Sequence, residues 1–148
     1  MFAEEPAWKV VDLVDEFDDP TGSKCLVALV SGKFSNSFAS NSKLDVYIFV
    51  DGVDECYFLF YEYGISNANA RWFYSDFFSF TVKDGEGVKS SFYREVSGYG
   101  TRFVSVGANF LSILEKGGLV QVSVKVGSTS YRFDVDTSGF VELFSAMF

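Results

Sequence analysis

The chain has 148 residues, of which 48% are hydrophobic and 19% aromatic, and it carries a net charge of −8. This composition is typical of one folded domain, over residues 1–148, and it excludes a disordered chain. The absence of histidine excludes the Ser-His-Asp and Cys-His catalytic designs and any histidine-ligated metal. We therefore expect a protein that is not an enzyme and that uses no metal and no cofactor.

The N-terminal segment MFAEEPAW lacks the basic and apolar regions of a signal peptide. No apolar run in the chain reaches the roughly 20 residues that span a bilayer. We therefore expect a cytoplasmic location, or a periplasmic one if a signal has been removed, and no membrane partner.

Negative charge is concentrated in the first part of the chain. Residues 1–64 carry twelve acids and four lysines, whereas residues 65–148 carry eight acids and eight bases. Such a field repels nucleic-acid phosphates and attracts a basic surface of another protein. An acidic face that only keeps the protein soluble is the alternative. The candidate partner-binding acids are Asp12, Asp15, Glu16, Asp18, Asp19, Asp51, Asp54 and Glu55.

Three apolar segments in the first half predict strands. The segments KCLVALV (24–30) and LDVYIFV (44–50) are dense in apolar side chains, as expected of strands covered on both faces. In CYFLFYEY (56–63), alternation puts Cys56, Phe58, Phe60 and Glu62 on one face and Tyr57, Leu59, Tyr61 and Tyr63 on the other. Both faces are largely apolar before Glu62, so we expect a central strand covered on both sides. A tyrosine hydroxyl needs water or a buried acceptor, so Tyr61 and Tyr63 are candidate partner contacts at the rim of the sheet.

The two cysteines, Cys25 and Cys56, have neither the spacing nor the histidines of a metal site. In a reducing compartment they are buried thiols, whereas in an exported protein they can form a disulfide. The sequence leaves both alternatives open.

The second half predicts hairpins and two short helices. KDGEG (83–87) is typical of a hairpin turn, and LVQVSVKV (119–126) with YRFDVD (131–136) alternates as a hairpin with one wet face. A helix is predicted over 108–118, with Gly117 as C-cap, and another from the N-cap candidate Ser138 to the C-terminus. Its apolar stripe makes Phe144, Met147 and Phe148 candidate partner contacts. The predicted fold class is all-β, a mainly antiparallel β-sandwich with two short α-helices, one before the last hairpin and one at the C-terminus.

Four segments between residues 78 and 144 follow one another in a familiar order: FTVKDG, VKSSFY, FLSILEKGGLVQVSV and FDVDTSGF. This order resembles the C-terminal part of the TagO/VasI-like family of type VI secretion accessory proteins. Trp8, the acidic segment DEFDDPTGSK and CLVAL match the earlier part of the pattern more loosely. The resemblance implies a β-sandwich that serves a larger assembly, and it implies no catalytic residues.

We predict a non-enzymatic protein–protein interaction module, an accessory or inhibitor of a larger assembly. The first alternative is a phage-borne, anti-CRISPR-like nucleic-acid mimic, whose carboxylates occupy a basic groove that normally holds phosphates. The second alternative is a hydrolase that uses two carboxylates alone.

Overall fold

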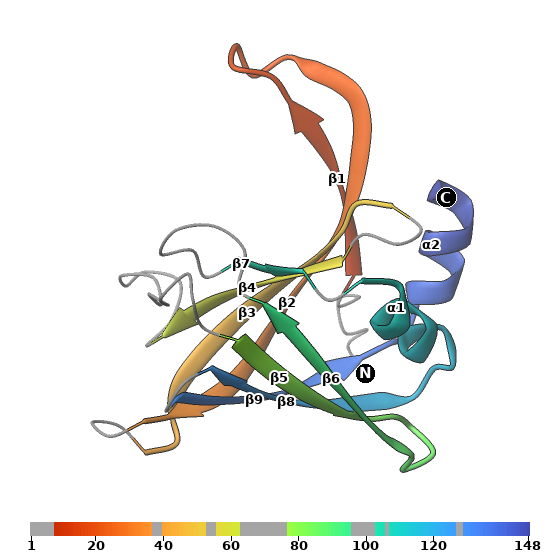
Figure 1. The fold of residues 1–148 in the computed structure, drawn as a ribbon. Coiled ribbons are helices and arrows are strands. Elements are labelled where there is room, and N and C mark those ends of the chain that lie inside the picture. The colour runs from red at the N-terminus through yellow and green to blue at the C-terminus, as the bar shows by residue number, and fades with distance from the viewer. Residues whose placement is uncertain are drawn as a thin grey trace, which may run out of the picture.

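The computed structural model describes residues 8–36, 40–52, 56–62, 77–95, 103–105, 107–126 and 129–148 (Figure 1). Every strand pairing is antiparallel, and the predicted all-β class with two short helices is confirmed. The elements are β1 (Trp8–Val14), β2 (Pro20–Ser35), β3 (Ser42–Val50), β4 (Cys56–Glu62), β5 (Phe77–Lys83), β6 (Lys89–Glu95), β7 (Phe103–Ser105), α1 (Gly107–Glu115), β8 (Leu119–Val126), β9 (Thr129–Asp136) and α2 (Phe140–Met147).

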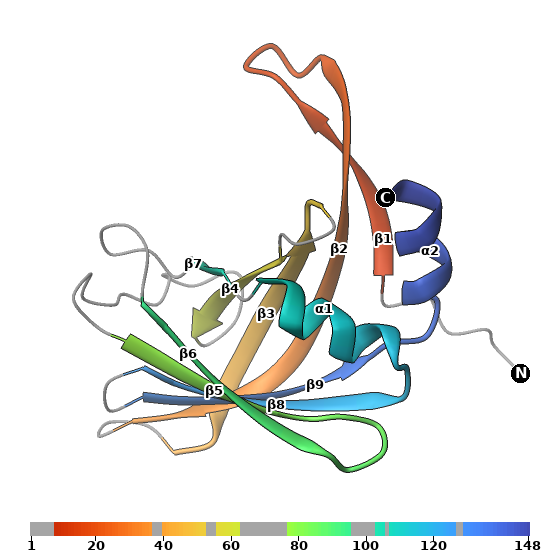
Figure 2. The ribbon, with the colours of Figure 1, turned by 45° about the vertical axis from the view of Figure 1, so that its right-hand side comes forward.

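The strands form one continuous sheet in the order β6-β5-β8-β9-β2-β3-β4-β7, with β1 paired to β2 beside this path. The sheet curls so that its two halves face each other, and α1 lies across the open side (Figure 2). The two layers that the sequence predicted are therefore parts of a single hydrogen-bonded sheet. Most strands bury alternate side chains, so one face of the sheet is apolar and the curl removes that face from water. Cys25 on β2 and Asp45 on β3 are buried on the other face.

Aromatic rings fill the space between the two halves. Phe58 on β4 is fully buried, and its ring centroid lies 5.3 Å from that of Phe133 on β9 and 5.0 Å from that of Phe110 on α1. Phe60 stacks on Tyr131 at 4.6 Å. The face of CYFLFYEY that carries Cys56, Phe58 and Phe60 is thus core. On the other face, predicted to be covered as well, Leu59 and Tyr61 are only half-buried.

The long strand β2 changes its neighbour along its length. Near its start it pairs with β1, and from Gly32 to Ser35 it pairs with β9 on that same side. A Cβ atom added at Gly32 would overlap the carbonyl oxygen of Arg132 and lie 2.7 Å from Cβ of Phe133. Glycine is therefore required where β9 approaches β2 most closely.

The helices agree with the prediction except at one cap. Helix α1 ends as expected, because Gly117 has a φ of 84° and donates its N–H to the carbonyl oxygen of Leu114. The prediction of Ser138 as N-cap of α2 was wrong: Gly139, with a φ of 81°, is the N-cap. The Ser138 amide instead donates to the Asp136 carboxylate at 2.9 Å, so this segment forms an Asx turn before the helix begins.

The predicted turn after β5 is held by one carboxylate. Asp84 is buried, and its Oδ1 accepts hydrogen bonds from the amides of Val88 at 3.0 Å and Glu86 at 2.9 Å. Lys116 Nζ lies 3.7 Å from Oδ2. The Val88 hydrogen bond, with smaller contributions from Glu86 and Lys116, lowers the pKa of Asp84.

This lowered pKa predicts an acid-sensitive contribution to stability. A carboxyl whose pKa is lower in the folded protein stabilises the fold above its ordinary pKa, and the contribution is lost as pH falls through the folded value. We expect Asp84→Asn to be less stable than the wild type at pH 7 and to lose less stability below about pH 4. Thermal melts from pH 7 to pH 2 measure both effects. Glu86→Gln, at an exposed position of the same turn, is the matched control and should lose stability in acid as the wild type does. If Asp84→Asn lost as much stability in acid as the wild type, the prediction would be contradicted.

Cys25 and Cys56 are both buried and form no disulfide, the first of the two alternatives that the sequence left open. Burial, and secondly the nearby charge of Asp51, raises the pKa of Cys25. The thiolate is therefore disfavoured at Cys25.

Candidate functional site

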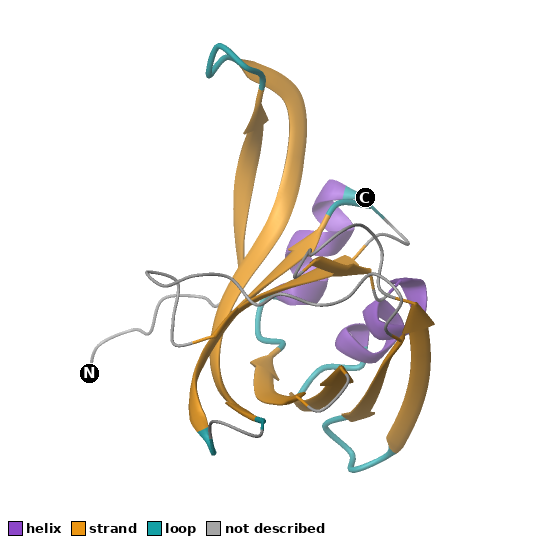
Figure 3. Cartoon of the chain, turned by 60° about the vertical axis from the view of Figure 1, so that its left-hand side comes forward, coloured by secondary structure: helices purple, strands orange, loops and turns teal. Residues whose placement is uncertain are grey.

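The most prominent surface feature is a projecting β-hairpin, here called the arm (Lys9–Lys24). It is formed by β1 and the start of β2, and it extends well beyond the rest of the molecule (Figures 1 and 3). Every residue of the arm is exposed. Its root is anchored by Trp8, which is buried, lies 4.8 Å from the ring of Phe140 and donates its indole N–H to the Asp136 carbonyl oxygen at 3.0 Å.

The tip of the arm (Asp15–Asp19) is an ordered acidic turn. The Asp15 Oδ1 atom accepts hydrogen bonds from the amides of Phe17 at 2.8 Å and Asp19 at 3.1 Å. Asp18 takes the left-handed conformation, with φ at 63°, which aspartate tolerates better than most residues. The Asp15 carboxylate therefore shapes the turn, while the exposed carboxylates of Glu16, Asp18 and Asp19 remain as its charged surface.

The arm also presents apolar side chains to solvent. Phe17 at the tip is 75% exposed, and Val14 beside it is 52% exposed. Val10, Val11 and Leu13 of β1 are exposed as well. Among the described residues, β1 pairs only with β2, so its outer edge has no strand partner. An unpaired edge flanked by apolar side chains is the kind of surface that a second protein chain covers.

The other predicted acids lie apart from the tip or outside the described residues. Asp12 lies on the arm, 3.8 Å from Lys24 Nζ. Asp51 is exposed just after β3, near Cys25 at the root of the arm. Asp54 and Glu55 lie outside the described residues. The structure therefore gathers the first acidic segment on one projecting element and places Asp51 elsewhere.

The predicted apolar contacts divide between core and surface. Phe144 is buried and stacks on Phe140, with ring centroids 5.3 Å apart, so it leaves little surface for a partner. Met147 and Tyr61 are half-buried, and Phe148 is exposed at the end of α2. Tyr63 lies outside the described residues.

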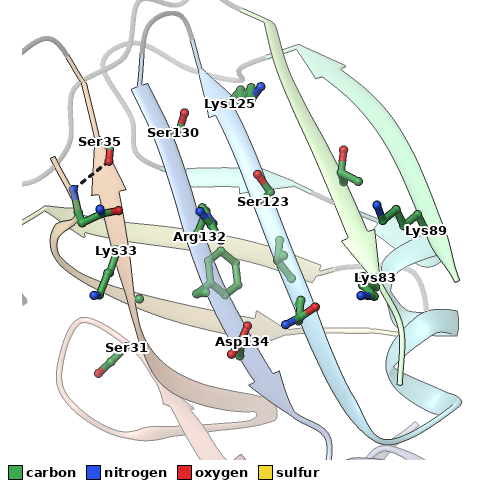
Figure 4. Close-up of a pocket in the computed structure, with 16 residues that line it drawn as sticks. Ser31, Lys33, Ser35, Lys83, Lys89, Ser123, Lys125, Ser130, Arg132 and Asp134 are labelled. Atoms are coloured by element: carbon green, nitrogen blue, oxygen red, sulfur yellow. Dashed lines mark hydrogen bonds between the residues drawn. The ribbon is translucent and has the colours of Figure 1, made fainter. Parts of the chain in front are cut away.

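Sequence reasoning missed a cationic surface on the outer face of the sheet. A hollow of about 1160 Å³ lies over β2, β9, β8, β5 and β6 (Figure 4). Hydroxyl side chains separate its bases, and Asp134 is the one acid among the described residues of its lining. The bases, here called the cationic face, are Lys33, Lys83, Lys89, Lys125 and Arg132. The available signal was the alternation of the two hairpins, which puts Lys125 and Arg132 on the outer side.

The hollow does not offer the chemistry of a carboxylate hydrolase. That reaction needs two carboxyl groups on either side of the bond, and the described lining contains only Asp134. No group of three or more cysteine, aspartate or glutamate side chains in the described ranges is placed to hold a metal ion. Neither described helix has the length and apolar composition of a membrane-spanning helix.

Comparisons of this chain with protein-family models, with curated proteins and with solved structures found no match. The resemblance to the TagO/VasI-like family stays a prediction.

Proposed function

We propose that this protein is a non-enzymatic interaction module that binds another protein through its arm. The observation that carries this proposal is the row of exposed apolar side chains from Val10 to Phe17 on a two-stranded hairpin. Such a hairpin has little stability of its own in water. A partner that covers Phe17 and pairs with the free edge of β1 would remove apolar surface from water and stabilise the arm.

The acidic tip supports a partner with a basic surface. Aromatic side chains at the centre of an interface supply most of its affinity, whereas exposed charges at the rim supply orientation and association rate. We assign these two roles to Phe17 and to its neighbours Glu16, Asp18 and Asp19. The accessory role and the cytoplasmic location stay predictions.

A matched pair of valines tests the proposal. Val14 on the arm is 52% exposed and Val88 in the β5–β6 turn is 53% exposed, so the same substitution costs similar apolar surface at both places. We expect Val14→Ser combined with Phe17→Ala to reduce capture of the partner from its native cell extract at least tenfold. Val88→Ser is expected to leave capture unchanged. Quantitative mass spectrometry of the captured proteins provides the measurement.

Thermal melts of the three proteins provide the control for folding, because exposed substitutions usually change stability by less than about 0.5 kcal/mol. If the arm variant (Val14→Ser with Phe17→Ala) captured the partner as well as Val88→Ser does, the proposal would be contradicted, since binding would then not depend on the arm.

A nucleic-acid mimic is the second candidate, supported by the exposed carboxylates of the tip. It predicts that capture falls steeply between about 50 and 200 mM salt, as phosphate contacts do. It also predicts that a short DNA duplex releases the captured protein. Capture that depends on Phe17 and persists at 200 mM salt would favour the interaction module instead.

A further inference from the structure

The charges of the cationic face are arranged against the stability of the sheet. Lys33 on β2 lies directly opposite Arg132 on β9 and, on its other side, opposite Lys43 on β3. Lys83 lies directly opposite Lys89. Like charges at opposed positions destabilise a sheet. Within the described residues, no base of the cationic face forms an ion pair with an acid. An anion that covers the face would relieve this repulsion.

The rows also carry the neutral groups that complete an anion site. Arg132 lies opposite Ser123 on β8, and Ser123 lies opposite Thr81 on β5, so hydroxyls continue the row that Lys33 and Arg132 begin. Lysine, arginine and hydroxyl side chains together donate the hydrogen bonds that carboxylates accept. The hollow over them gives room for an incoming loop (Figure 4).

The chain itself carries an anionic loop. The tip of the arm has four carboxylates in five residues, at Asp15, Glu16, Asp18 and Asp19. It lies at the opposite end of β2 from the cationic face, since Pro20 and Lys33 are thirteen residues apart on this strand. At about 3.3 Å per residue this separation is about 40 Å along the strand. The arm points away from the face (Figure 1), so the two surfaces of one molecule do not meet.

We propose that the cationic face receives the acidic tip of the arm from a second copy of this chain. This inference rests on the proposed function, because the arm is the contact element in both. The contact is head to tail, so each copy uses its tip on one neighbour and its face on another, and the copies extend into chains or close into a ring. Both a second copy and a nucleic acid are repelled by the net charge of −8. A second copy suits the face better, because the tip brings four carboxylates on a short projecting loop, whereas a long polyanion extends past the face onto the negative parts of the molecule.

Two charge variants separate the two surfaces. The tip variant is Glu16→Gln with Asp18→Asn and Asp19→Asn. It retains Asp15, whose carboxylate holds the turn, and asparagine tolerates the left-handed conformation of Asp18. The face variant is Lys33→Gln with Arg132→Gln, and it removes two opposed cations, so its thermal stability should equal or exceed that of the wild type.

Sedimentation velocity at increasing protein concentration measures the association. For the wild type we expect the association constant to fall at least tenfold from about 50 to 500 mM salt, because salt screens the contact. At about 50 mM salt the association constant of each variant alone is expected to be at least tenfold lower than that of the wild type. An equimolar mixture should form a 1:1 dimer that does not grow, since only the face variant's tip and the tip variant's face remain intact.

A third variant tests whether additional negative charge on the arm strengthens or weakens the association. Lys24→Gln removes the base that lies beside Asp12 and makes the arm more acidic. The head-to-tail contact predicts stronger association, whereas general repulsion between more negative molecules predicts weaker association.

A wild type that stays monomeric at about 50 mM salt, or a mixture of variants that stays monomeric, would overturn the inference. So would a fluorescent DNA duplex that binds the wild type and the tip variant but not the face variant, because nucleic acid would then be the occupant of the face. If copies do not associate but Val14→Ser with Phe17→Ala still abolishes capture, the proposed function stands and this inference alone fails.

Discussion

Phe58→Ala is expected to lower the free energy of unfolding by about 3–5 kcal/mol, the usual cost of removing a buried phenylalanine ring. Phe58 is fully buried, and its ring lies 5.0 Å from that of Phe110, 5.3 Å from that of Phe133 and 6.3 Å from that of Phe80. The substitution therefore leaves a cavity between both halves of the sheet and α1. Chemical denaturation followed by circular dichroism measures the change.

Leu59→Ala is the matched control, since Leu59 is the next residue of β4 and lies half-buried on the outer face. We expect it to cost less than half as much. Equal losses at the two positions would contradict the assignment of the faces of β4.

Gly32→Ala is expected to lower the melting temperature by about 10 °C, because overpacking of this kind costs about 3 kcal/mol and each kcal/mol shifts the melting temperature of a chain of this size by about 2–4 °C. The added Cβ would meet the carbonyl oxygen of Arg132, which belongs to the backbone of β9 and can move only if the β2–β9 pairing moves. Thermal melts measure the shift.

Gly22→Ala separates this steric effect from backbone strain. Gly22 has a φ of 85° but has open space around its Cβ position, whereas only the approach of β9 constrains Gly32. A left-handed conformation costs a non-glycine residue about 1–2 kcal/mol, and Gly22 lies on the exposed arm. A smaller loss at Gly32 than at Gly22 would contradict the close contact between β2 and β9.

The sequence identified the acidic segment, but it did not predict that this segment forms the tip of a projecting hairpin. The apolar segment KCLVALV predicts a strand after the acidic turn, and the structure confirms it as part of β2, which begins earlier, at Pro20. Nothing in the segment predicts that its strands extend as a two-stranded arm with Phe17 at the end, because that depends on where β3 and β9 stop pairing with β2. For the same reason, the sequence does not show that Val10, Val11, Leu13 and Val14 are exposed, as they are in the structure.

The cationic face was missed because its bases come from distant parts of the chain. Lys33, Lys83 and Arg132 are each separated by about fifty residues, and each alone is an ordinary outward-facing position. The register between β2 and β9 and between β5 and β8 brings them onto one face. No local pattern encodes that register.

The sequence by itself determined many elements of this protein: the strands at KCLVALV, LDVYIFV and CYFLFYEY, the last hairpin, both helices and the turn at Asp84. These follow from alternation, helical spacing and turn chemistry, which act between residues close in the chain. Only the tertiary structure decided that one sheet curls around the core, that an acidic arm projects from it and that a cationic face lies at its other end. Those features depend on non-local strand pairing, in which Gly32 and Arg132 meet across a hundred residues of chain.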